Sequence, residues 1–332
     1  MTEATISQES TDLTDRLRGG GTSRPGESVR IAPFRHLARH QMMKKWDTVA
    51  IVGVGLIGGS VGLCLRRAGL AKTVVGIGRR QSSLRKARRR EAVTTTTTSI
   101  ARGVADADVV VVCSPVRQIA DHVAEAADAC PDGSLITDAG SIKGQILAAV
   151  KHRCPEGLPR GVDFVGAHPL AGSDKSGVEF ALDDLFVKRP CIVTPTEDLP
   201  DRSINAVLDF WRSLGARVIR MTPAEHDAAV ACVSHVPHIA AAALASLAAG
   251  NLNVVGTGWL DTTRIAAADV ELWRQILTGN RAAVLKALDK YETVLSAFRD
   301  ALAAEDDSRL LAMLETGKEN RVASEKTARD RK

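Results

Sequence analysis

A glycine-rich segment has the spacing of a phosphate-binding loop. Residues 53–58 have the sequence Gly-Val-Gly-Leu-Ile-Gly, which follows an apolar β-branched run and opens a stretch with helical spacing. In such a unit the first glycine makes the turn, the second lets the backbone approach a pyrophosphate, and the third lets helix and strand pack closely. We therefore predict dinucleotide binding at Gly53, Gly55, Leu56, Ile57 and Gly58. A tight turn without a ligand is the alternative.

The end of the second strand indicates which dinucleotide is bound. NAD-binding folds usually place an Asp or Glu there to hold the ribose 2′-hydroxyl. Here Gly78 occupies that place, and Arg79 and Arg80 follow it. An arginine can pair with a 2′-phosphate, and the missing carboxylate removes a repulsion. The sequence therefore favours NADP over NAD without excluding NAD; solvated surface arginines are the alternative.

Ser114 and Pro115 end a fully apolar strand, Asp108 to Cys113. Because ligands of open α/β sheets bind at the carboxyl ends of strands, we predict that both residues contact the cofactor, with Pro115 as a wall beside the nicotinamide. A plain strand-ending turn is the alternative.

The composition argues against several other classes of protein. The 332 residues are 45% hydrophobic and 25% charged, as in ordinary globular chains, and the net charge is only +5. Aromatic residues make up 3%, too few for a platform that stacks nucleic-acid bases. A basic run between Arg85 and Arg90 leaves nucleic-acid binding as the weakest alternative; a solvated helix face explains the run more simply. We therefore expect no nucleic-acid partner.

The sequence also bears on metal binding and on the compartment of the protein. Six dispersed cysteines without a CxxC pair indicate free thiols in a reducing compartment. His235 and His238 share a helix face, but no third ligand is placed beside them, so no metal is predicted. No apolar run reaches about 18 residues and no signal-peptide core is present, so we expect a cytoplasmic protein without a membrane partner.

The elements that position these residues alternate between strands and helices up to about Thr222. Such alternation predicts a parallel sheet covered on both faces, as in a Rossmann-type domain. From Pro223 onward only helical periodicity remains, with breaks at 250–258 and 278–280. The predicted strands are 48–52, 73–77, 108–113, 134–138, 164–166 and 191–194, and the predicted helices are 56–68, 82–91, 119–129 and one starting at 143.

This pattern predicts three segments. Residues 1–45 form a disordered extension, with the native start at Met42 or Met43. Residues 46–222 form the α/β Rossmann-type dinucleotide-binding domain. Residues 223–332 form an all-α helical domain; the family resemblance of the motifs below implies that it binds substrate and dimerises.

Several longer motifs occur in a defined order. Together they resemble the prephenate and arogenate dehydrogenases of tyrosine biosynthesis, from Trp46 to past Trp273. The resemblance implies a Rossmann-type domain joined to a helical dimerising domain, hence a homodimer. It also implies NAD(P)-dependent oxidative decarboxylation of prephenate to 4-hydroxyphenylpyruvate, of arogenate to tyrosine, or both. The motifs are GVGLIGGS (53–60), DAGSIKG (138–144), GAHPLAGSDKSG (166–177), SHVPH (234–238), DTTRIA (261–266) and LW (272–273).

The resemblance also assigns catalytic residues. His168 is then the catalytic histidine, which accepts a hydrogen bond from the ring hydroxyl as hydride departs; we place it in a loop after the 164–166 strand. Its ordinary pKa of about 6.5 leaves it largely neutral at pH 7. Ser141 is then a polar group that orients His168 and the substrate hydroxyl. A helix N-cap is the alternative role for Ser141.

Substrate-binding residues follow from the same motifs. Arg264 is the expected carboxylate anchor, since its planar fork suits bidentate pairing, and it should meet His168 in a cleft between the two domains. His238 is expected in the substrate pocket. Asp174 matches a position that gates the pocket in relatives, where Glu is often found. Lys143 is a second candidate cation, with a solvated helix lysine as the alternative.

Two other functions compete with this one. The chain could be another NAD(P)-dependent hydroxyacid dehydrogenase with a helical C-terminal domain, or a non-catalytic dinucleotide sensor. The sequence leaves open the choice between prephenate and arogenate, and feedback by tyrosine.

Overall fold

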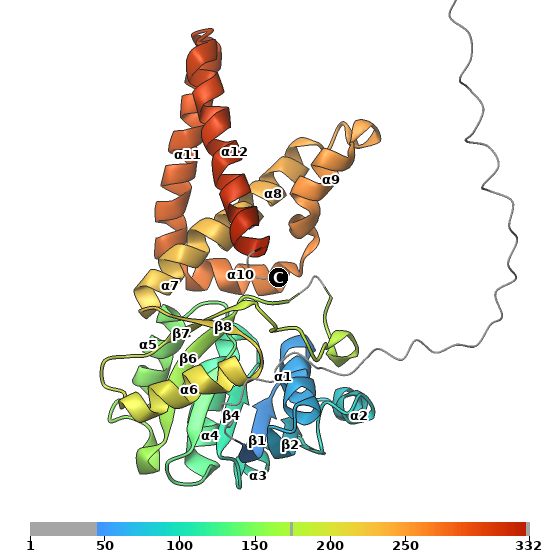
Figure 1. Cartoon of the computed structure of the whole chain (residues 1–332), viewed down its shortest axis with the longest axis vertical. Coiled ribbons are helices and arrows are strands. Elements are labelled where there is room, and N and C mark those ends of the chain that lie inside the picture. Colours follow the sequence, from blue (N-terminus) through green and yellow to red (C-terminus); the bar gives the residue numbers. More distant parts are fainter. Residues whose placement is uncertain (1–44, 173–174, 330–332) are drawn as a thin grey trace, which may run out of the picture. The chain divides into compact units, whose positions relative to one another are not determined.

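The computed structural model describes residues 45–172 and 175–329 (Figure 1). All of them belong to a single unit, Met43–Lys332. Asp174 and all but the last residue of the predicted extension 1–45, with the expected start at Met42 or Met43, lie outside the described residues.

Eight strands of the described chain form one sheet in the order β3-β2-β1-β4-β5-β6-β7-β8. The strands up to β6 pair in parallel, as the alternation predicts. The pairing of β6 with β7 is antiparallel, with His168 opposite Ile192, which corrects the expectation of a wholly parallel sheet. The strands are β1 (Trp46–Val52), β2 (Ala71–Ile77), β3 (Thr95–Thr97), β4 (Val109–Val112), β5 (Leu135–Asp138), β6 (Asp163–Pro169), β7 (Pro190–Thr194) and β8 (Arg217–Arg220).

Helices cover both faces of this sheet because its central strands are apolar on both sides. All four valines of β4 are buried, for example. Side chains of α1, α2 and α6 join the core on one face, and those of α3, α4, α5 and α10 join the core on the other. The sheet helices are α1 (Leu56–Arg67), α2 (Gln81–Arg89), α3 (Ile100–Val104), α4 (Ile119–Ala129), α5 (Gly144–Arg153) and α6 (Asp201–Ser213).

The chain becomes helical after β8, so the predicted fold class is confirmed. Thr222 and Glu225 form a reciprocal capping box that starts α7, with Pro223 in its first turn. Figure 1 shows α7 and α10 next to the sheet, and α8, α9, α11 and α12 beyond them. These helices are α7 (Pro223–Val230), α8 (Val236–Leu247), α9 (Thr257–Thr263), α10 (Val270–Gly279), α11 (Arg281–Ala303) and α12 (Asp307–Arg329).

A π-helical turn, η4 (Ala231–His235), joins α7 to α8. Pro237 follows it and has no N–H to donate within an α-helix, which favours a local departure from α geometry. In a regular helix, residues nine positions apart such as His226 and His235 point about 180° apart. The wider turn shifts the register and turns His235 toward the side of His226 and Asp227.

The segment Pro223–Leu247 is long and apolar enough to cross a membrane by length and composition, with a mean hydropathy of 1.6 in its most apolar 18-residue window. The expectation drawn from uninterrupted apolar runs did not foresee this. A core helix of a soluble protein passes the same test. In this chain the segment carries His226 and Asp227, whose side chains bond to groups of β6 and α5.

Candidate active site

A pocket of about 380 Å³ lies at the carboxyl ends of β1, β2 and β4. The strand order reverses between β1 and β4, which is the point where open α/β sheets bind ligands. Six of the predicted cofactor residues line the pocket: Gly53, Gly55, Arg79, Arg80, Ser114 and Pro115. Leu56, Ile57 and Gly58 lie just behind it, in the first turn of α1.

The glycines of the loop meet distinct steric demands. Gly53 has a φ of +95°, and a Cβ there would lie 2.7 Å from the Cys113 carbonyl oxygen. A Cβ on Gly58 would lie 2.2 Å from the Gly53 carbonyl oxygen, so this glycine lets α1 start against the loop. A Cβ on Gly55 would meet nothing within 4 Å, although Gly55 lines the pocket. No side chain of the described residues caps α1, so its first amide groups suit a phosphate.

The far wall of the pocket is basic. Arg79 and Arg80 line it, and Arg80 is the N-cap residue of α2. Sequence reasoning missed several other polar residues of the wall, among them His122 and Glu179. His122 holds the Ser114 hydroxyl at 2.8 Å through Nδ1. Glu179, from the β6–β7 connection, pairs with Lys86 at 2.5 Å.

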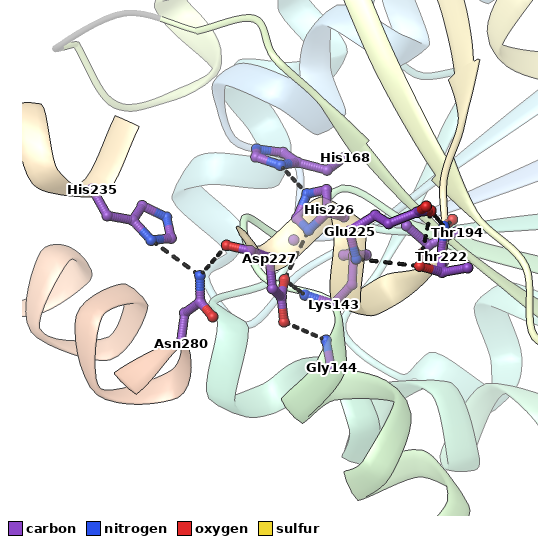
Figure 2. Close-up of polar contacts among 12 residues, drawn as sticks. Lys143, Gly144, His168, Thr194, Thr222, Glu225, His226, Asp227, His235 and Asn280 are labelled. Atoms are coloured by element: carbon purple, nitrogen blue, oxygen red, sulfur yellow. Dashed lines mark hydrogen bonds and ion pairs between the residues drawn. The ribbon is translucent and has the colours of Figure 1, made fainter. Parts of the chain in front are cut away.

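A chain of hydrogen bonds leads away from His168 (Figure 2). Its Nδ1 lies 2.9 Å from Nε2 of His226, and Nδ1 of His226 lies 2.8 Å from Oδ1 of Asp227. His168 is half-buried, whereas His226 is fully buried. The structure places His168 inside β6, one residue before its end, rather than in the loop expected from the sequence. Strand pairing with β7 therefore fixes its backbone.

Asp227 also holds the start of α5. Its Oδ1 accepts the N–H of Lys143 and its Oδ2 accepts the N–H of Gly144, both at 2.8 Å. These amides belong to the helix start, which leaves N–H groups without partners inside the helix. The alternative role for Ser141 as the N-cap of α5 is therefore wrong, because Lys143 is the N-cap residue. Ser141 is half-buried in the β5–α5 connection. No hydrogen bond joins it to His168 among the described residues.

Lys143 differs from both roles expected for it. Its side chain is fully buried, and its ammonium donates to Asp138 at 2.5 Å and to the Ala167 carbonyl oxygen at 2.7 Å. Asp138 in turn accepts the N–H groups of Ala167 and Gly140. The ammonium is thus neither solvated nor open to a substrate. It instead secures β6 next to His168.

The surroundings of His168 and Asp227 shift both acid–base equilibria. Burial, with repulsion from His226, Lys143 and His235, holds the pKa of His168 well below its ordinary value. Burial opposes ionisation of Asp227, but hydrogen bonds from His226 and from the two amides outweigh it and lower the pKa of this carboxyl. At neutral pH His168 is therefore an uncharged base and Asp227 is a carboxylate.

His235 and His238 occupy separate environments. His235 is buried, and its Nδ1 lies 3.3 Å from the Asn280 side-chain nitrogen, which also donates to the Asp227 carbonyl oxygen. Burial lowers the pKa of His235 to about 4. The His238 ring stacks on Trp273 with centroids 3.6 Å apart, and its buried Nδ1 has no partner among the described residues. The rings of His238 and Trp273 line an apolar cleft of about 550 Å³.

Two further expectations concern metal and Arg264. No group of three or more His, Cys, Asp or Glu able to hold a metal is found in the described part of the chain. Arg264 is exposed at the end of α9. The structure describes no contact between Arg264 and His168, so their expected meeting in one cleft is not seen within this chain.

Comparison with known proteins gives consistent matches. Residues 61–220 match the family model of the prephenate dehydrogenase nucleotide-binding domain, and residues 222–316 match that of its dimerization domain. The prephenate dehydrogenase of Bacillus subtilis is 30% identical, over 83% of this chain and 75% of its own length.

Two solved structures are similar over most of their length. One is prephenate dehydrogenase from Aquifex aeolicus in complex with hydroxyphenyl propionate and NAD+, with 32% identity and a TM-score of 0.77, covering 83% of this chain and 98% of that one. The other is Synechocystis arogenate dehydrogenase, with 29% identity and a TM-score of 0.72, covering 83% and 99%.

Replacing Lys143 tests the buried ion pair. In Lys143→Met the Asp138 carboxylate stays buried without its cation, so the free energy of unfolding should fall by about 3–5 kcal/mol. Urea denaturation measures this change. Lys151→Met, an exposed position on the same helix, is the matched control and should change stability little. Equal effects in the two variants would contradict a structural role for the pair.

Proposed function

The chain belongs to the prephenate dehydrogenase family, and we propose that it catalyses the NAD(P)-dependent oxidative decarboxylation of prephenate, of arogenate, or of both. One observation carries the proposal: an uncharged histidine, His168, is fixed near the end of β6 in the same sheet whose β1, β2 and β4 end at the pocket lined by Gly53 and Gly55. A sensor protein would have no use for such a base, and the family membership favours this reaction over that of another hydroxyacid dehydrogenase.

The reaction requires a base and exact placement of the substrate carbon that gives up hydride. Hydride leaves the carbinol carbon of the cyclohexadiene, the ring carboxylate leaves as carbon dioxide, and the ring becomes aromatic. A group that accepts a hydrogen bond from the carbinol hydroxyl favours the departure of hydride from the same carbon. His168 offers this lone pair at Nε2 when its Nδ1 carries the ring proton and donates it to His226.

The pocket fits a nicotinamide dinucleotide, which supplies the hydride acceptor when bound. Gly53 and Gly55 would hold its pyrophosphate together with the open N-terminus of α1, and Gly58 would let α1 approach. Ser114, held by His122, and Pro115 would form the wall beside the nicotinamide.

We assign NADP as the preferred dinucleotide. Arg79 and Arg80 face the pocket from the end of β2, where an NAD-binding fold usually has an acid. Gly78 stands in that place, and a Cβ there would lie 3.3 Å from Cδ2 of Leu84. Two guanidinium groups without a competing carboxylate at this position suit a 2′-phosphate.

The substrate side is assigned to His238, Arg264 and Ser141. Nδ1 of His238 is buried without a partner in the described part of the chain, so it could accept a hydrogen bond from a substrate group. Arg264 is exposed and available to a carboxylate. Ser141 lies in the connection that follows β5, the strand paired with β6, and could reach the substrate hydroxyl. Lys143 is not included, since its ammonium is enclosed.

We further propose that the protein acts as a homodimer in the cytoplasm. Its residues 222–316 match a dimerization domain, and large apolar side chains such as Val233, Leu247, Leu285 and Leu302 are exposed there. All six cysteines are free, as the reducing cytoplasm maintains them.

A substrate grid tests the function. Purified protein should reduce NADP in the presence of prephenate or arogenate, followed by absorbance of the reduced nicotinamide. His168→Asn should lower kcat by about 10²–10⁴-fold, since the base is lost while binding groups remain. His152→Asn, at an exposed histidine of α5, is the control. Cofactor binding without turnover of either substrate would refute the proposal.

The pH profile tests the state of His168. Protonation of its Nε2 removes the lone pair, so kcat/KM falls as the pH drops through the pKa of this histidine. Because burial, His226, Lys143 and His235 lower that pKa, kcat/KM should remain level through pH 6.5 and fall only in more acid solution. A loss of activity centred near pH 6.5, the ordinary value for histidine, would contradict the proposed environment.

Arg79→Ala tests the dinucleotide preference. Loss of a charge-assisted contact to the 2′-phosphate should raise the KM for NADP about tenfold or more, with little effect on the KM for NAD. Arg85→Ala, on the exposed side of α2 and outside the pocket, should change neither. Steady-state kinetics with both dinucleotides decide the matter. A wild-type protein that prefers NAD would overturn the assignment.

A further inference from the structure

We infer that His226 and Asp227 are a positioning pair that fixes His168 in the tautomer with its lone pair on Nε2, ready for the substrate hydroxyl. The inference rests on the proposed function, because the lone pair is useful only to a reaction that needs a base. His226 and Asp227 do not touch the substrate in this role; they act through His168.

The tautomer is set from the Asp227 end of the chain. Both carboxylate oxygens accept backbone N–H groups at the start of α5, and two such donors favour the ionised form. An ionised carboxylate can only accept hydrogen bonds. The 2.8 Å contact between Oδ1 and Nδ1 of His226 therefore requires the proton to be on Nδ1.

The position of the proton on His226 then determines the position of the proton on His168. A neutral imidazole carries one N–H and one lone pair. With its proton on Nδ1, His226 has its lone pair on Nε2 and accepts a hydrogen bond from Nδ1 of His168, 2.9 Å away. Neutral His168 then has no proton on Nε2. The opposite arrangement would bring the lone pair of His226 against a buried carboxylate oxygen, where no water can relieve the repulsion.

The hydrogen bond from Nδ1–H of His168 to His226 is retained as Nε2 of His168 takes up the hydroxyl proton. The Nδ1–H of His168 points to a lone pair whose own ring is oriented by a carboxylate. Serine proteases use a carboxylate next to their catalytic histidine in this way. Here a second imidazole is interposed, so the carboxylate acts from farther away.

Three elements meet in this arrangement. His168 belongs to β6, His226 and Asp227 belong to α7, and the two amides belong to the start of α5. Asn280, which precedes α11, adds a bond to the Asp227 carbonyl oxygen. The tautomer of His168 therefore depends on how α7, the first helix after β8, packs against the sheet.

The direct test is ¹⁵N NMR of the full-length protein labelled at histidine, with the His168 signals identified by their loss in His168→Asn. At neutral pH the wild-type protein should show a protonated Nδ1 and an unprotonated Nε2 for His168. A protonated Nε2 in the neutral ring would overturn the inference. This readout needs no turnover, so it separates failure of the inference from failure of the proposed reaction.

Variants supply the kinetic test. In Asp227→Asn an amide replaces the carboxylate that accepts three hydrogen bonds. Both His168 tautomers should then be populated. We expect kcat to fall by about 10²–10⁴-fold, with KM changed much less. The control is Glu225→Gln, the same kind of change in the same turn of α7 but outside the chain of bonds. An unchanged His168 tautomer and kcat in folded Asp227→Asn would overturn the inference.

A second pair of variants guards against a folding defect. In His226→Gln the amide oxygen can still accept from Nδ1 of His168, so this variant should keep more of the kcat than His226→Leu, which offers no acceptor. Thermal denaturation and dinucleotide binding establish that both variants are folded. Equal kcat losses in the two folded variants would show that packing, rather than the hydrogen bond, is what His226 provides, and would also overturn the inference.

Discussion

The Asp227 carboxylate is the constraint on which the site depends. It lies within α7, yet its hydrogen bonds go to the start of α5 and, through His226, to His168 on β6. A buried carboxylate is costly unless its oxygens are satisfied, so these contacts hold the three elements in one arrangement. The same contacts that stabilise the charge also orient His168, the base of the proposed reaction.

Two further features of the sheet help to position the site: the dinucleotide pocket and a buried ion pair. The switch between β1 and β4 opens the dinucleotide pocket, and the tight turn at Gly53 keeps the loop against Cys113. On the other side, the buried pair of Lys143 and Asp138 ties β5 and α5 to the Ala167 backbone, one residue before His168. His168 is therefore held from the side of α5 and β5 and from the side of α7.

Local sequence patterns predicted much of this structure, but they did not predict contacts between residues that are far apart in the chain. The loop from Gly53 to Gly58, the missing acid at Gly78 and the helical change after Thr222 are properties of short segments, and each was found. The burial of Lys143 and the role of His226 depend on partners tens of residues away in the chain, which no spacing rule reveals. The antiparallel pairing of β7 with β6 was not predicted, because the residue pattern of a strand does not indicate its direction in the sheet. The helix α6 could have been found, since Ile204, Val207, Leu208 and Trp211 follow helical spacing.

The most direct test of the account is a crystal structure of the protein with NADP and the product-like ligand 4-hydroxyphenylpropionate. We predict the phenolic oxygen at about 2.6–3.2 Å from Nε2 of His168. The contact between Nδ1 of His168 and Nε2 of His226 should be retained, and the dinucleotide should lie along Gly53 and Gly55. A phenolic oxygen bound elsewhere, or a His168 ring turned away from His226, would contradict the account.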